Sequence, residues 1–153
     1  CIRDRTYSIN TKVVRIFNTY GPRMQLNDGR VVTNFIVQAL NNENITIYGN
    51  GSQTRSFSYV DDTVNGIIAL MESSYNDVFN IGNPNEITIN ELANKIIKLT
   101  NSKSRLINKD LPDDDPKQRR PDINKAKNLL NWEPVVELDD GLTKTIDWVS
   151  SQL

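Results

Sequence analysis

Hydrophobic residues occur along this chain in two patterns, short β-branched or aromatic runs and longer stretches with helical spacing. The short runs predict strands, because Val, Ile and Phe favour extended backbone, and they cover residues 12–17, 45–48, 56–59, 78–81 and 105–107. Helical spacing predicts helices over residues 31–40, 61–72, 89–100, 122–130 and 138–151. Strands and helices therefore alternate, which indicates an α/β fold.

The predicted helices carry recognisable start signals and apolar faces. Thr88 followed by Glu91 forms a capping box, whereas an aspartate starts the helices at 61–72 (Asp61 or Asp62) and 122–130 (Asp122). The expected apolar side of the helix at 61–72 consists of Val64, Ile67, Ile68 and Met71. The final helix is expected to bury Leu138, Leu142, Ile146 and Val149, and the two tryptophans, Trp132 and Trp148, are expected to anchor the core.

Residue usage excludes several kinds of chemistry. The 153 residues include no histidine and a single cysteine, which excludes a Ser-His-Asp triad, a Cys-His pair, an internal disulfide and a cysteine-rich zinc site. The formal charge of −1 gives no general attraction to nucleic acid or to an anionic membrane. Residues 111–121 read as a polar loop, and we reject a metal site at its three consecutive aspartates, because their side chains point in different directions.

Three segments are candidates for anion binding, each with an ordinary alternative. Residues 49–55 combine two glycines with Arg55 and resemble a phosphate cradle, or they form a glycine turn with a solvated arginine. Residues 117–120 include two adjacent arginines that suit a diphosphate, or they form a solvated face. Asn18 follows the first strand, where ligands bind in open α/β sheets, or it belongs to a plain strand-to-loop turn.

Two familiar signals are absent from the chain. No Gly-x-x-Gly-x-x-Gly follows a strand, and no tyrosine has a lysine four positions later. The chain begins with Cys1, and its first strand lies close to that end. We therefore expect a fragment of a larger protein.

Taken together, several segments resemble the C-terminal half of the extended short-chain dehydrogenase/reductase family, and within it the UDP-glucuronate decarboxylases. The resemblance rests on residues 15–24, 27–35, 48–57, 79–84, 119–122 and 132–134, in family order. It implies the last strands of a parallel, Rossmann-like sheet followed by the smaller substrate-binding domain, over residues 1–153. The NAD-binding half and the catalytic Tyr-x-x-x-Lys pair would lie upstream.

The resemblance also implies a reaction and a set of site residues. The parent enzyme would convert UDP-glucuronate to UDP-xylose and CO2 through an NAD-bound 4-keto intermediate. The alternatives are a nucleotide-sugar 4,6-dehydratase or 4-epimerase, and a non-catalytic nucleotide-sugar-binding module. Arg119 is the expected assisting catalytic residue, and Thr19 and Arg23 are expected to touch NAD. The expected substrate-binding residues are Asn18, Arg30, Val31, Val32, Thr33, Asn34, Phe35, Tyr48, Gly49, Ser52, Gln53, Arg55, Asn80 and Arg119.

The expected partner is UDP-glucuronate or a related UDP-sugar, with no nucleic acid and no membrane contact from this segment. The parent is expected to be a homodimer in the cytoplasm, or in the Golgi lumen if it carries an N-terminal anchor. A strand at residues 12–17 without its sheet neighbours would leave an exposed apolar edge.

Overall fold

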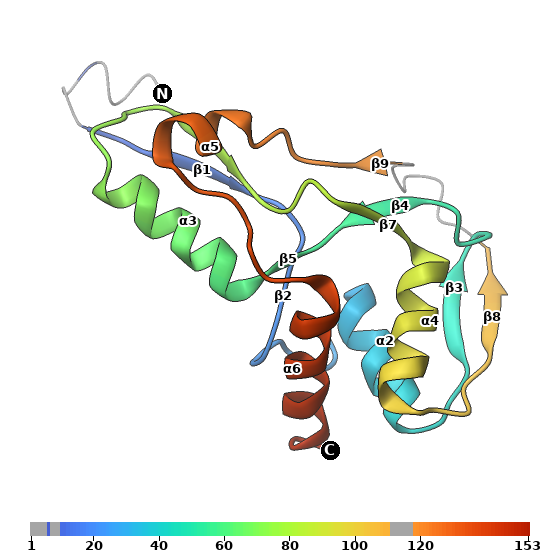
Figure 1. Cartoon of the computed structure of the whole chain (residues 1–153). Coiled ribbons are helices and arrows are strands. Elements are labelled where there is room, and N and C mark those ends of the chain that lie inside the picture. Colours follow the sequence, from blue (N-terminus) through green and yellow to red (C-terminus); the bar gives the residue numbers. More distant parts are fainter. Residues whose placement is uncertain (1–5, 7–9, 111–117) are drawn as a thin grey trace.

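The computed structural model describes residues 6, 10–110 and 118–153, and its elements form two groups that lie side by side (Figure 1). In the first group, β1 (Val13–Ile16) pairs in parallel with β6 (Val78–Ile81). Helices α3 (Val60–Glu72) and α5 (Asn124–Leu130) pack against β6. The small core between them contains Leu70, Phe79, Ile81, Ile123, Ala126 and Trp132.

The second group contains three helices that pack on one another, α2 (Val31–Leu40), α4 (Ile89–Thr100) and α6 (Leu138–Ser150). Beside them β3 (Ile45–Tyr48) pairs in parallel with β8 (Leu106–Lys109). This group holds the larger core, with fully buried Ile36, Ile45, Leu92, Ile96, Leu142 and Val149.

Short strands join the two groups. Strand β2 (Thr19–Tyr20) pairs in parallel with β5 (Ser58–Tyr59). Strand β4 (Thr54–Ser56) lies between β7 (Glu86–Thr88), which runs antiparallel to it, and β9 (Gln118–Arg119), which runs parallel. The chain therefore passes several times between the groups, and these passages bring distant residues together.

Most predicted elements are confirmed, because their patterns are strong. The helix at 31–40 and the strands at 45–48 and 78–81 have the predicted bounds. The capping box is present, with the Thr88 hydroxyl accepting from the Glu91 amide and the Glu91 carboxylate accepting from the Thr88 amide. Leu142, Ile146 and Val149 of α6 are buried, as is Trp132, whereas Leu138 and Trp148 are partly buried against the larger core.

Two extended segments differ from the prediction. The single strand expected at 56–59 is two strands that separate at Phe57, because β4 pairs with β7 and β9 while β5 turns away to pair with β2. Gln118 and Arg119, expected in a loop, form β9, because their backbone finds β4 as a partner. The three aspartates at 113–115 lie outside the described residues.

The start and the buried side of α3 were also predicted wrongly. Its N-cap is Tyr59, and Asp61 and Asp62 lie in the first turn without capping it. The helix buries Asp62, Thr63, Gly66 and Leu70, whereas three of the four residues of its expected apolar side, Val64, Ile68 and Met71, are exposed.

Two contacts explain this rotation of α3. A Cβ on Gly66 would lie 2.8 Å from both Ile81 and Trp132, so the helix approaches the core at its smallest residue. The Asp62 carboxylate accepts from the Val136 amide (3.0 Å), and the Asp62 carbonyl accepts from the Trp132 indole (3.0 Å). The close approach at Gly66 and the hydrogen bonds of Asp62 therefore set the orientation of α3, and most of its apolar side does not face the core.

The N-cap of helix α5 lies one residue later than predicted. It is Ile123, and Asp122 instead accepts a bond from the Asn124 amide (2.9 Å).

The expected exposed edge is present on β1. Among the described residues β1 pairs only with β6, and Val13 and Ile16 are exposed by 44% and 54%. Within the described part of the chain, no helix is long and apolar enough to span a membrane.

Candidate functional site

A cavity of about 760 Å³ opens where β1 and β2 end, between the start of α2 and strands β3, β4 and β8. This volume is within the range of small-molecule sites, and the position beyond a parallel strand is typical of ligand sites in α/β proteins. The lining consists of Ile16, Phe17, Asn18, Thr19, Tyr20, Met24, Gly29, Arg30, Val31, Val32, Asn34, Phe35, Gln38, Thr46, Tyr48, Gln53, Arg55, Phe57, Ile89 and Lys109.

The charges of this lining have a single sign. Three cations line the cavity, Arg30, Arg55 and Lys109, and no carboxylate does so among the residues that the structure describes. Arg30 is paired with Asp28 (Nε to Oδ2, 3.1 Å), but its side chain remains 65% exposed. A cavity with this lining favours an anionic ligand.

Arg55 projects from β4, and the residue is only 8% exposed. Its Nη1 donates to the carbonyl of Thr54 (2.8 Å). Strand register makes Arg119 of β9 the direct partner of Arg55. Two arginines that are distant in sequence are therefore backbone neighbours. For Arg119 the structure describes the backbone alone.

The N-terminus of α2 forms one wall of the cavity, with Val31, Val32, Asn34 and Phe35 in its lining. The first amide groups of a helix have no partner within it and attract anions. Here the N-cap, Arg30, makes no side-chain capping bond, and the first turn contains no acidic residue.

The ends of β1 and β2 also line the cavity. Asn18 donates through Nδ2 to the carbonyl of Ser56 (3.3 Å), and the Thr19 hydroxyl lies 3.1 Å from that of Thr63. Tyr20 is buried behind them, and burial raises the pKa of its hydroxyl. The Tyr20 hydroxyl therefore stays protonated and donates to the Leu138 carbonyl (3.2 Å), which makes it a structural group.

Tyr48 and Gln53 form the outer rim. Gln53 donates to the carbonyl of Tyr48 (2.8 Å), and Tyr48 is 49% exposed. Between them the turn at 49–51 requires glycine, because Gly49 and Gly51 have φ of +72° and +73°. An exposed aromatic ring at the rim of an anion-binding cavity suits a planar ligand group such as a base.

The cavity brings together most of the residues that the sequence singled out, but not all of them. Asn18, Thr19, Arg30, Tyr48, Gln53 and Arg55 line it, together with four residues of α2. Gly49, Ser52, Thr33, Asn80 and Arg23 do not belong to its lining.

Those five residues have other contacts or conformations. Ser52 bonds to Asn50 (2.7 Å), and the Thr33 hydroxyl donates to the sulfur of Met24 (3.6 Å). Asn80 donates to the carbonyl of Asp122 (2.9 Å). Gly49 lies in the turn described above, and Arg23 has a left-handed backbone with φ of +68°.

Sequence reasoning missed several lining residues, including Met24, Gln38, Thr46 and Lys109. Gln38 on α2 bonds to the amide of Thr46 on β3 (3.2 Å), a contact between elements that no local pattern records. Lys109 is the last residue of β8, and a lone lysine at the end of a short strand is not part of any motif.

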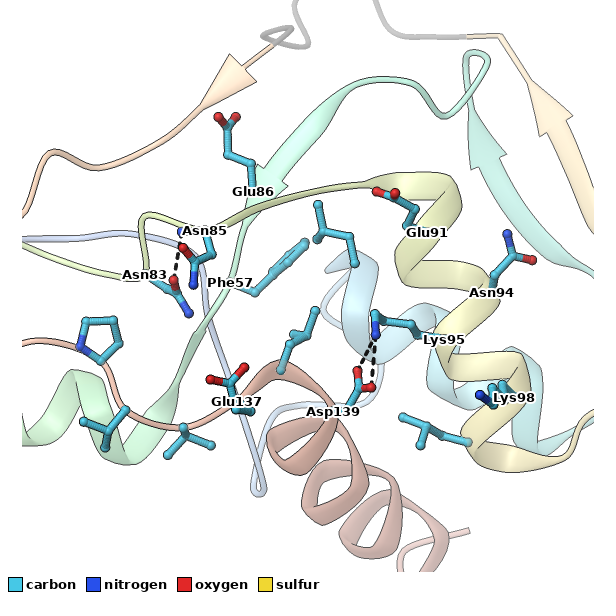
Figure 2. A pocket seen from close by; sticks show the side chains of 16 residues that line it. Phe57, Asn83, Asn85, Glu86, Glu91, Asn94, Lys95, Lys98, Glu137 and Asp139 are labelled. Carbon is cyan, nitrogen blue, oxygen red and sulfur yellow. Dashed lines mark hydrogen bonds and ion pairs between the residues drawn. The ribbon is translucent and has the colours of Figure 1, made fainter.

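A second cavity, of about 620 Å³, lies between α4, β7 and residues 134–139 (Figure 2). Its lining mixes four carboxylates, from Glu86, Glu91, Glu137 and Asp139, with the ammonium groups of Lys95 and Lys98. Lys95 is paired with Asp139 (2.7 Å). This balance does not favour an anion, so the cavity at β4 and α2 is the better candidate for the function.

Comparison with known proteins gives close relatives in sequence. The chain is 54% identical over 145 residues to UDP-glucuronic acid decarboxylase 1 of Danio rerio. It is 47% identical over 142 residues to UDP-glucuronic acid decarboxylase 1 of Arabidopsis thaliana. These matches cover 95% and 93% of the chain but only 35% and 33% of the relatives. The chain thus spans about a third of their length.

Solved structures share the fold. UDP-glucose 4-epimerase of Thermotoga maritima, solved with UDP-glucose, matches with a TM-score of 0.94 and 33% identity, over 99% of this chain and 49% of that one. UDP-glucuronic acid 4-epimerase of Bacillus cereus, solved with UDP-glucuronic acid and NAD, matches with a TM-score of 0.92 and 30% identity, over the same shares of each chain. The α/β, Rossmann-like fold class expected from the sequence is therefore confirmed.

The family model described as GDP-mannose 4,6 dehydratase matches residues 3–145, nearly the whole chain. The fold and the positive charge of the cavity agree with this match. The chain belongs to the GDP-mannose 4,6 dehydratase family.

Proposed function

We propose that this chain is the nucleotide-sugar-binding part of a UDP-glucuronate decarboxylase. The observation that carries the proposal is the cavity, where Arg30, Arg55 and Lys109 meet a helix N-terminus and no carboxylate among the described residues. A nucleoside diphosphate sugar carries at least two negative charges, and glucuronate adds a third. The 54% identity to a decarboxylase favours UDP-glucuronate over other nucleotide sugars.

The chain is proposed to be the C-terminal portion of its parent, with the NAD-binding half upstream. Parallel strands are normally buried within a larger sheet, and β1 has an unpaired edge in the described structure with Val13 and Ile16 exposed. Structures of the same fold are about twice as long as this chain. A parallel neighbour from the other half would cover this edge.

Several residues of the cavity have proposed roles. Arg55 is positioned to bind the diphosphate with two parallel hydrogen bonds, and the amides at the start of α2 would bind the same group. Tyr48 would cover the uracil, and Asn18 would hold the diphosphate or the sugar. Thr19 is proposed to touch the cofactor from the end of β2.

The residues present do not make a complete NAD site, since the chain has no glycine fingerprint and no Tyr-x-x-x-Lys pair. NAD is proposed as the cofactor of the whole enzyme, where it supplies reversible oxidation at C4 of the sugar. This chain would contribute electrostatics to the loss of CO2. Arg119 is proposed to stabilise the negative charge left on the sugar, because a guanidinium is a poor acid and a good counter-ion.

The test is turnover by the full-length protein with UDP-glucuronate and NAD. We expect equal amounts of CO2 and UDP-xylose, measured as released gas and by chromatography of the nucleotide sugars. A C4 epimer that retains the carboxylate would support the epimerase alternative, which the structural neighbours favour. We expect no turnover from the 153-residue chain alone, because the hydride acceptor and the base are proposed to lie elsewhere.

A further inference from the structure

We propose that Lys109 contacts the phosphate next to the nucleoside, a role that supplements the contacts of Arg55. This inference rests on the proposed function, because it assigns a residue to the same nucleotide-sugar site. It starts from a side chain that no motif in the sequence indicates.

The backbone around Lys109 is held firmly at the cavity. Strand register pairs Lys109 of β8 with Tyr48 of β3. The Lys109 carbonyl accepts from the Gly49 amide (2.8 Å), and the neighbouring Asn108 side chain donates to the Gly49 carbonyl (2.6 Å). The end of β8 is thus fixed to the turn that follows β3, and Lys109 lines the cavity.

The charge of Lys109 has no partner within the described part of the protein. Other lysines do form ion pairs there, Lys95 with Asp139 (2.7 Å) and Lys125 with Asp77 (2.5 Å). Lys109 makes no such pair with a described residue, and no described carboxylate lines its cavity. Its ammonium group is therefore available to an anionic ligand.

The neighbours of Lys109 indicate which part of the ligand it meets. Tyr48, its partner across the strands, is the exposed aromatic ring at the rim that suits the base. Arg55 is nearly buried on β4. Because Lys109 lies beside Tyr48, it is nearer to the phosphate attached to the nucleoside than to the sugar. Lysine also suits a partly exposed phosphate, because it acts as a hydrated point charge without a fixed geometry.

The experiment compares Lys109→Met with the wild type in the full-length protein, by calorimetry with UDP, UMP and uridine. At low salt we expect UDP and UMP to bind about two- to fivefold more weakly, the range for an exposed ion pair. Uridine, which has no phosphate, should bind equally well. The loss should shrink at high salt because the ions screen an exposed charge, and Lys109→Arg should restore wild-type affinity.

Lys103→Met is the matched control, because Lys103 is exposed and lies outside the lining of the cavity. An equal loss in this control would overturn the proposal, since any lysine would then act through the general field. Unchanged UDP affinity in Lys109→Met, or an equal loss for uridine, would also overturn it. If the wild type itself fails to bind UDP, the proposed function fails and this inference fails with it.

Discussion

Replacing Arg55 with alanine is the most informative perturbation of the candidate site. Arg55 lines the cavity and is nearly buried, and its Nη1 donates to the Thr54 carbonyl (2.8 Å). A bound diphosphate would therefore meet a cation that is already oriented and largely stripped of water. Little conformational entropy is lost on binding in such a case, so most of the interaction energy contributes to affinity.

The size of the effect follows from the type of bond. A hydrogen bond to a charged group contributes about 1.5–3 kcal/mol. Since about 1.4 kcal/mol corresponds to a factor of ten in Kd, Arg55→Ala should weaken UDP binding by about 10- to 150-fold. Arg55→Lys should lie in between, because it keeps the charge and loses the two-pronged geometry of the guanidinium.

The assay is titration calorimetry of the full-length protein with UDP, with thermal melts of every variant. Melting is needed because Arg55 is buried and its removal leaves the Thr54 carbonyl without this donor. A variant that melts as a folded protein and binds UDP with unchanged affinity would remove Arg55 from the site and refute the reasoning. Arg55→Lys binding no better than Arg55→Ala would show that charge alone contributes nothing.

Two further predictions concern stability and are checked by melting the full-length protein. Hydrogen bonds from the amide and hydroxyl of Thr88 lower the pKa of Glu91; the stabilisation is therefore present above the ordinary glutamate pKa and is lost as the pH falls through the lowered value. Glu91→Gln should reduce this loss of stability at low pH. A variant whose stability still follows the wild-type pH profile would contradict the role assigned to Glu91. Gly141→Ala should destabilise the protein by about 1–3 kcal/mol, because the new methyl group would collide with the Tyr20 hydroxyl and lie 2.9 Å from the Tyr59 ring. An unchanged or higher Tm would show that the helix-propensity gain of alanine dominates.

The fold was predictable from the sequence wherever one local pattern decided the element. Helix α2 has its predicted bounds because Val32, Phe35, Ile36 and Ala39 all pack inward at helical spacing. Helix α4 begins where its capping box requires.

Prediction was wrong where tertiary contacts outweighed periodicity. In α3 the close approach at Gly66 and the buried Asp62 decide the orientation, so the apolar residues Val64, Ile68 and Met71 face outward. The break at Phe57 and the strand at 118–119 depend on partners far away in the chain. No window of local sequence contains those partners.

In the candidate site too, residues within motifs were predicted and residues placed by tertiary contacts were missed. Asn18 and Arg55 were found through motifs that resemble a family, and both line the cavity. Lys109 was missed because its relevance comes only from pairing β8 with β3. Arg119 was expected in a loop, so its backbone pairing with Arg55 was not predicted. Their strand register supports the proposal that both arginines belong to one site.

The most direct test of the account is a crystal structure of the full-length protein with UDP bound. We predict that the diphosphate lies in the cavity within hydrogen-bond distance of the Arg55 guanidinium and of the first amides of α2, with the uracil against Tyr48. A nucleotide bound elsewhere on the protein, with this cavity holding only solvent, would contradict the central claim.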